Sequence, residues 1–125
     1  MDIPVVMLLD DEPMMLRVLE RILTAPGYEL VTASTIAEAQ ALLPQFGGRL
    51  KLAFLDLWLT DGKGTTFAEE LLAKCPGISI VITTGDSLDD LEAYEVLSKP
   101  FEISDLRAVV RRMLGVPSSD GTDAG

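Results

Sequence analysis

The sequence predicts an α/β fold in which a five-stranded parallel sheet is doubly wound, with helices on both of its faces. Short apolar runs alternate five times with segments whose apolar residues recur at helical spacing. Gly and Pro pairs separate successive units, as at Pro26 and Gly27. With 125 residues, of which 48% are hydrophobic, the chain is long enough for one domain with its own core.

The first half of the chain predicts two strand–helix units. Val5–Leu9 is an apolar run between a proline and an aspartate and predicts the first strand. An apolar stripe that starts at Met15 predicts the helix after it, and residues 28–32 read as the second strand. Thr35 and Glu38 form a capping box before a second helix, whose inner face carries Ala39, Leu42, Leu43 and Phe46.

Three further units follow in the second half. Residues 52–55 are continuously apolar, which is typical of a strand buried on both faces. A glycine-bearing loop at 61–64 leads to a third helix, for which Thr66 and Glu69 predict a capping box. Strands are expected at 78–83 and 96–97. The last helix has Leu106, Val109, Val110 and Met113 on its inner face and ends at Gly115.

Two segments depart from this regular pattern. Only fourteen residues separate Thr84 from Lys99, so we predict a shortened or irregular fourth helix within residues 87–94. Residues 117–125 are rich in Ser, Asp and Gly and lack apolar periodicity, which predicts a disordered tail or linker after a domain at 1–116.

The composition excludes several functions. The net charge is −10 and there is no histidine, so we expect no direct binding to nucleic acid or to anionic membranes. Catalytic triads and metal sites that need histidine are excluded, and the single Cys75 rules out an internal disulfide. The N-terminus lacks the basic region of a signal peptide, so we expect a cytoplasmic protein.

Three aspartates fall at the ends of predicted strands. Asp10 and Asp11 follow the first strand and Asp56 follows the third. In a flavodoxin-like (βα)5 sheet of order 2-1-3-4-5, these two strands are neighbours, so the carboxylates should converge at the edge where such sheets bind ligands. Carboxylate oxygens with room for water suit Mg²⁺. The alternative is that each aspartate only caps the helix that follows it.

Two other strand ends add polar groups to the same edge. Thr83 and Thr84 end the fourth strand, and Lys99 follows the fifth. A lysine that faces a carboxylate pocket supplies a point positive charge for an anion. Taken alone, Lys99 would be an ordinary surface lysine, but its combination with the threonines and the three aspartates is specific.

The stretches LLDDEP, FLDLWLTDGKG, ITTG and SKPF occur in this order, and together they resemble the receiver domain of two-component response regulators, the CheY-like superfamily. The resemblance covers about residues 3–115. It implies that Asp56 is the phosphoacceptor. It also implies that Mg²⁺ is held by Asp10, Asp11, Asp56 and the backbone carbonyl of Trp58.

The resemblance implies further roles around the same pocket. Lys99 would contact a phosphoryl oxygen, and the peptide bond before Pro100 would be cis. Thr84 would be the hydroxyl that moves toward the phosphoryl group, with Thr83 as the alternative because the register is uncertain by one residue. Gly64 matches the family's loop glycine.

The resemblance also implies the partners and the kind of activity. The donor would be a sensor histidine kinase or a phosphotransfer protein, which explains why this chain needs no histidine. Such a protein signals by protein–protein interaction and catalyses only its own phosphorylation and dephosphorylation. We expect a monomer. The sequence leaves open whether it is a stand-alone regulator or the receiver of a hybrid kinase.

The sequence leaves the output surface and two alternative functions open. Val96 stands where the family usually has an aromatic residue, so the output surface is left open, and the first helix with Met14 is one candidate. A degenerate receiver that only binds proteins is the main alternative function. A haloacid-dehalogenase-type phosphatase is disfavoured because Trp58 stands where that family needs a second aspartate.

Overall fold

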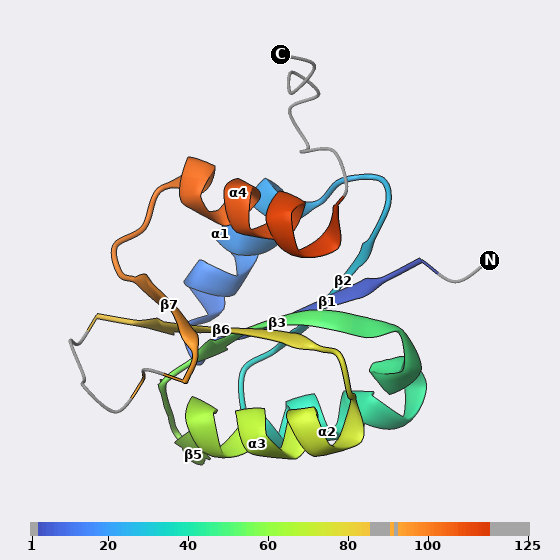
Figure 1. Cartoon of the computed structure of the whole chain (residues 1–125). Helices are drawn as coiled ribbons and strands as arrows, with labels where there is room; N and C mark the ends of the chain where they lie inside the picture. Colours follow the sequence, from blue (N-terminus) through green and yellow to red (C-terminus); the bar gives the residue numbers. More distant parts are fainter. Residues whose placement is uncertain (1–2, 86–90, 92, 116–125) are drawn as a thin grey trace.

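The structure is a computed structural model of the whole chain, and it describes residues 3–85, 91 and 93–115. Five parallel strands form one sheet of order β2-β1-β3-β6-β7, and helices lie on both of its faces (Figure 1). The elements in chain order are β1 (Val5–Leu9), α1 (Pro13–Leu23), β2 (Glu29–Ala33), α2 (Ile36–Phe46), a 3₁₀ turn (Gly47–Arg49), β3 (Leu50–Asp56), β4 (Trp58–Leu59), β5 (Gly62–Lys63), α3 (Gly64–Lys74), β6 (Ser79–Thr84), β7 (Glu95–Ser98) and α4 (Ile103–Leu114).

The predicted flavodoxin-like strand order is confirmed. Strands β6 and β7 are the fourth and fifth strands of the main sheet, because β4 and β5 form a separate antiparallel hairpin. The sequence analysis treated that hairpin as a plain loop. The predicted tail, residues 117–125, lies outside the described residues. So does most of 87–94, the segment for which a short or irregular helix is predicted.

Two apolar layers hold the helices against the sheet. Alternate residues of the central strands point to opposite faces, so Val6, Leu8 and Phe54 pack with α1 and α4, and Met7, Leu9 and Leu55 pack with α2 and α3. All six side chains are buried. The strands β1 and β3 are therefore covered on both sides, as their continuous apolar sequences predict.

Local signals explain where most helices begin and end. Thr35 caps α2 by accepting a hydrogen bond from the backbone N–H of Glu38. The Glu38 carboxylate accepts from the N–H and hydroxyl of Ser34, one residue earlier than an ideal capping box requires. Gly115 has the left-handed conformation expected of a helix C-terminus, with φ of 67°.

The predicted capping box for the third helix is wrong. The helix α3 already begins at Gly64, two residues before Thr66, and its N-cap residue Lys63 makes no side-chain capping bond. The backbone N–H of Gly64 instead donates to the carbonyl of Leu57 at 2.9 Å. Tertiary contact with the end of β3 therefore starts this helix where the local sequence signal does not.

No helix in the described part of the chain is long and apolar enough to span a membrane.

Candidate functional site

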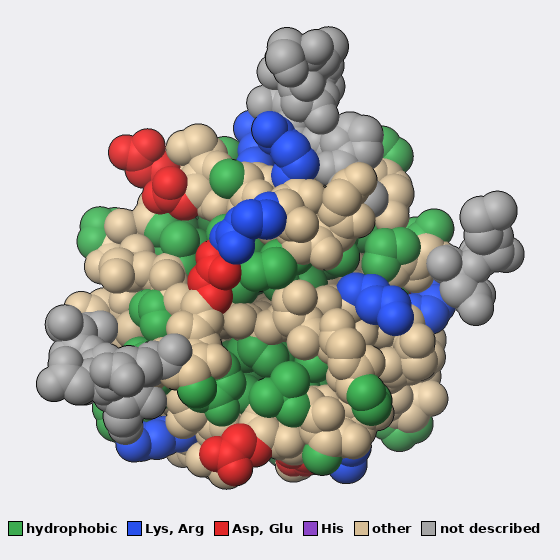
Figure 2. All heavy atoms as spheres, in the orientation of Figure 1, with side chains coloured by type: hydrophobic (Ala, Val, Ile, Leu, Met, Phe, Trp, Pro, Cys, Tyr) green, Lys and Arg blue, Asp and Glu red, His purple; other side chains and the backbone are tan. Residues whose placement is uncertain are grey.

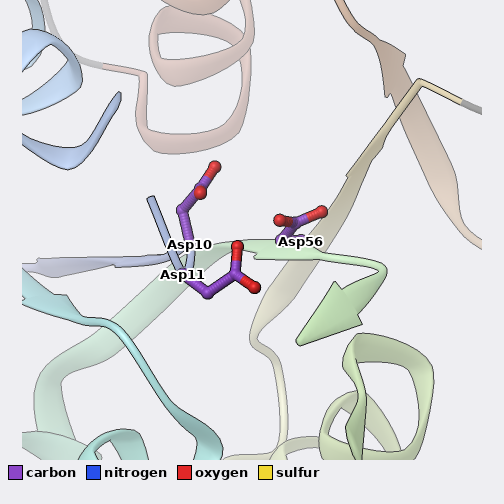
Figure 3. A group of neighbouring side chains, drawn as sticks. All are labelled: Asp10, Asp11 and Asp56. Carbon is purple, nitrogen blue, oxygen red and sulfur yellow. The ribbon is translucent and has the colours of Figure 1, made fainter. Parts of the chain in front are cut away.

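The three aspartates predicted from the strand ends lie together at one edge of the sheet (Figure 3). Strands β1 and β3 are hydrogen-bonded neighbours, and Leu9 pairs with Leu55 in their register, so the next residues share this edge. Asp10, Asp11 and Asp56 each offer a carboxylate oxygen within 4.8 Å of the other two. Asp10 and Asp56 are buried, at 3% and 7% exposed. Such a group of oxygens fits a hard divalent cation.

The two carboxylate oxygens of Asp10 make different contacts. Its Oδ1 accepts a hydrogen bond of 2.9 Å from the backbone N–H of Glu12, the N-cap residue of α1. This contact is a local turn two residues long and not the helix cap of the alternative interpretation, because α1 has no side-chain capping bond at its N-cap. The other oxygen, Oδ2, faces the pocket and is bonded to a lysine. The bond to Glu12 therefore orients the carboxylate and leaves its second oxygen for the site.

Lys99 supplies the positive charge of the pocket. Its Nζ lies 3.0 Å from Asp10 Oδ2 and 3.4 Å from Asp56 Oδ2. The backbone N–H of Lys99 donates to the carbonyl of Thr84 at 2.8 Å, which fixes the residue at the end of β7. The peptide bond to Pro100 is cis, as the resemblance implies. Residues at the ends of strands β1, β3 and β7 thus meet at the ammonium group of Lys99.

Lys99 does not fully compensate the negative charge of the three carboxylates in the pocket. Burial is the main cause that raises the pKa of Asp56; Lys99 lowers it, and the charges of Asp10 and Asp11 raise it again. Burial pulls the pKa of Lys99 down, but the bonds and charges of Asp10 and Asp56 outweigh burial and raise it overall. Additional positive charge would therefore be favourable here, and the all-oxygen donor set fits Mg²⁺.

The strand register distinguishes the two threonines. Thr83 is the direct partner of Asp56 across β3 and β6. Side chains of register partners point to the same face, and this is the face on which Val81 packs with α1 and α4. Thr84 points to the opposite face, where Ile82 packs with α2 and α3. The register therefore places Thr83, the alternative in the sequence analysis, on the Asp56 face of the sheet; which of the two hydroxyls serves the phosphoryl group stays a prediction.

The loop after Asp56 is an ordered hairpin. Trp58 pairs with Lys63 and Leu59 with Gly62. The Trp58 ring is half-exposed, which agrees with a position at the rim of the pocket, and Lys63 Nζ lies 4.8 Å from its centroid. Gly64 closes the hairpin, because a Cβ there would come within 2.2 Å of the Asp56 carbonyl oxygen.

Sequence reasoning missed the anchoring role of Asp61 at the tip of this hairpin. Its carboxylate accepts hydrogen bonds from the backbone N–H groups of Ile36 and Ala37, at 2.9 Å and 3.1 Å. These residues are 25 and 24 positions away in the chain. No local sequence pattern predicts such a contact, because it depends on how α2 lies beside the hairpin.

An apolar groove lies beside the pocket, between α1 and α4. It is lined by Met15, Val18, Leu19, Ile22, Lys99, Pro100, Phe101, Ile103 and Leu106. Val18 and Ile103 are 48% and 47% exposed, and Met14, one helical turn before Val18, is 71% exposed. The first helix therefore presents apolar side chains to solvent next to the site lysine.

Fold and site together define a class of protein: an α/β domain with an acidic pocket at the carboxyl edge of its parallel sheet. Comparison with known families makes the class specific. The family model of the response regulator receiver domain matches residues 6–111. The chain belongs to this family.

Individual relatives agree with this assignment. The chain is 31% identical to the alginate biosynthesis transcriptional regulatory protein AlgB of Pseudomonas aeruginosa, over 89% of this chain and 26% of that protein. It is 34% identical to the transcriptional regulatory protein KdpE of Mycobacterium tuberculosis, over 86% of this chain and 51% of that protein. The chain thus spans only a quarter to a half of these curated relatives.

A solved structure supports the fold. A CheY-like response regulator receiver domain protein from Methanospirillum hungatei superimposes with a TM-score of 0.80 and 26% identity. The superposition covers 91% of this chain and 95% of the other.

Proposed function

We propose that this receiver domain accepts a phosphoryl group on Asp56 from a partner histidine kinase or phosphotransfer protein, in a Mg²⁺-dependent reaction. The convergence of Asp10, Asp11 and Asp56, with Lys99 bonded to two of them, is the observation that carries this proposal. A purely structural aspartate at a strand end has no need of two more carboxylates and a half-buried ammonium group.

Asp56 would act as the nucleophile. One of its carboxylate oxygens attacks phosphorus in line with the leaving group, so that a P–O bond forms while the P–N bond of the phosphohistidine donor breaks. The electron pair of that bond stays with the imidazole of the partner. The product on this chain is an acyl phosphate, and later attack by water returns the carboxylate and free phosphate.

The surrounding residues would stabilise the charge of the phosphoryl group. Mg²⁺, when bound, would neutralise negative charge on the phosphoryl oxygens, held by the three aspartates and the backbone carbonyl of Trp58. Lys99 reaches Asp56 Oδ2 at 3.4 Å and would contact a phosphoryl oxygen there. The Thr83 hydroxyl, on the same face of the sheet as Asp56, would donate to another.

Signalling would then proceed through contact with other proteins. The net charge of −10 disfavours nucleic acid. On the face drawn in Figure 2, acidic and basic side chains lie in small groups, one acidic group directly beside a basic one, with hydrophobic side chains between them. The exposed apolar groove beside Lys99 would receive the phosphodonor, because a partner bound there reaches Asp56 without crossing the domain.

Phosphorylation with a small donor tests the proposal directly. Incubation with Mg²⁺ and acetyl phosphate should add about 80 Da to the wild-type protein and nothing to Asp56→Asn. Omitting Mg²⁺ should also prevent the adduct. A wild-type protein that binds Mg²⁺ but forms no adduct would instead be a degenerate receiver that acts as an unphosphorylated binding module.

A further inference from the structure

The hairpin that carries Trp58 is attached to the rest of the domain at two ends. At its base, the N–H of Leu57 donates to the carbonyl of Thr83 and the N–H of Gly64 donates to the carbonyl of Leu57, at 3.0 Å and 2.9 Å. These bonds tie the base to the main sheet and to the start of α3. Leu59, just before the turn, also packs against the apolar layer that α2 and α3 form with the sheet. The two-residue turn itself lies beyond these contacts.

The tip is held by Asp61. Strand β4 ends at Leu59 and β5 begins at Gly62, so Asp61 lies in the two-residue turn between them. Its two carboxylate oxygens accept separate hydrogen bonds from Ile36 and Ala37, the first two residues of α2. The N–H groups at this position have no partner inside the helix, and the helix dipole also favours a negative charge there.

The fit of the tip against α2 is close. A Cβ at Gly62 would come within 2.9 Å of Ile36 Cδ1, and Gly62 has φ of 151°. The hairpin therefore rests directly on the first residue of α2, and Asp61 bonds to the same residue. The contact combines packing with charge-assisted hydrogen bonds, which are stronger than neutral ones.

Capping of α2 does not by itself account for Asp61. The helix has a local cap in Thr35, which accepts from the N–H of Glu38. Thr35 and Asp61 therefore stabilise the same helix end through different N–H groups, but only Asp61 belongs to the hairpin. The two residues provide a natural comparison between helix capping and placement of the hairpin.

We propose that Asp61 is a positioning residue for the metal centre: it clamps the β4–β5 hairpin to the start of α2 and so holds the Trp58 backbone carbonyl at the rim of the carboxylate pocket. The inference rests on the proposed function, because it takes the Trp58 carbonyl as a ligand of Mg²⁺. Residues that orient metal ligands without touching the metal influence affinity strongly.

The experiment compares Asp61→Ala and Asp61→Asn with the matched control Thr35→Ala. Mg²⁺ affinity is measured from the fluorescence of Trp58, the only tryptophan, and amide hydrogen exchange is measured in metal-free protein. Asp61→Ala should weaken Mg²⁺ binding about tenfold and speed exchange at Ile36, Ala37 and Gly64. Asp61→Asn, which retains one carbonyl acceptor, should show a smaller effect. Thr35→Ala should speed exchange at Glu38 and leave the Mg²⁺ midpoint unchanged.

The outcomes separate this inference from the proposed function. Equal Mg²⁺ midpoints for Asp61→Ala and wild type, or equal shifts for Asp61→Ala and Thr35→Ala, would overturn the clamp and leave the metal site intact. Failure of the wild-type protein to bind Mg²⁺ would overturn both. If Asp61→Ala does not fold, Asp61→Asn decides by the same two measurements, and an unshifted midpoint in that variant would count against the clamp.

Discussion

Gly64 lies so close to Asp56 that a Cβ on the glycine would come within 2.2 Å of the aspartate's carbonyl oxygen. The helix α3 therefore starts directly against the end of β3, and the chain between them must fold back on itself as a hairpin. This close backbone approach thus fixes the base of the hairpin beside the residue that would carry the phosphoryl group.

Substitution of Gly64 by alanine should destabilise the protein strongly. The neighbouring atoms are backbone and have little freedom to move, so we expect the free energy of unfolding to fall by about 3 kcal/mol. Gly48→Ala is the control, because a Cβ at that position would meet nothing within 4 Å, and it should change stability by less than about 0.5 kcal/mol. Urea unfolding measures both values, and equal values for the two variants would contradict the prediction.

Removal of the Lys99 charge should lower the stability of the metal-free protein but strengthen Mg²⁺ binding. In metal-free protein, Lys99→Met leaves Asp10 and Asp56 without their cation, and we expect a loss of about 2 kcal/mol. The same change removes a positive charge that competes for Asp10, so Mg²⁺ should bind more tightly by on the order of 1 kcal/mol, about fivefold. Weaker Mg²⁺ binding in Lys99→Met would contradict this argument.

The matched control for that variant is Lys74→Met. Lys74 forms an exposed ion pair with Glu70, one helical turn earlier. Such pairs contribute about 0.5 kcal/mol or less, so neither the unfolding free energy nor the Mg²⁺ midpoint should change appreciably. Thermal unfolding with and without Mg²⁺ reads out both quantities in one series.

The two threonines at the end of β6 should differ in their effect on phosphoryl chemistry. Thr83→Ala removes the hydroxyl on the Asp56 face, so phosphorylation by acetyl phosphate should slow about tenfold. Thr84→Ala changes a buried side chain on the other face, so it should lower stability by about 1 kcal/mol with little effect on the rate. A rate loss confined to Thr84→Ala would reverse the assignment.

Asp61 should give the protein a specific acid sensitivity. The hydrogen bond from Ile36, and with it the bond from Ala37, holds the pKa of Asp61 below its ordinary value of 3.8. A carboxylate whose pKa is lower in the folded state adds stability above the unfolded-state pKa and loses it as the pH falls through the folded-state pKa. The stability difference between wild type and Asp61→Asn should therefore be larger at about pH 6 than at about pH 3, as measured by urea unfolding.

The groove between α1 and α4 should matter for the protein donor and not for a small one. Val18→Ser and Ile103→Ser change half-exposed side chains, so stability should change by about 0.5 kcal/mol at most. Phosphorylation by acetyl phosphate should be unaffected, whereas transfer from a phosphorylated histidine phosphotransfer domain should fall by about tenfold. Leu72→Ser, an exposed apolar residue on α3, is the control and should affect neither donor.

The strand–helix pattern was predictable because the spacing of apolar residues within each segment specifies it. The run Val5–Leu9 and the stripe that follows it specify a buried strand and an amphipathic helix without reference to the rest of the chain. Once the units alternate in this way, a parallel sheet is expected, and the flavodoxin-like strand order then makes β1 and β3 neighbours, so that Asp10, Asp11 and Asp56 converge at one edge. The capping box predicted at Thr66 failed because contact with β3 starts α3 earlier, at Gly64.

By itself, then, the sequence determined the architecture, the family resemblance and the three carboxylates of the pocket. The tertiary structure decided that Thr83 is the register partner of Asp56, that Lys99 bonds to Asp10 as well as Asp56, and that Asp61 bonds the hairpin to α2. The physical reason is that periodicity and strand ends are local properties. Strand register, ion pairing and long-range capping depend on where distant segments come to lie, and no spacing along the chain records that.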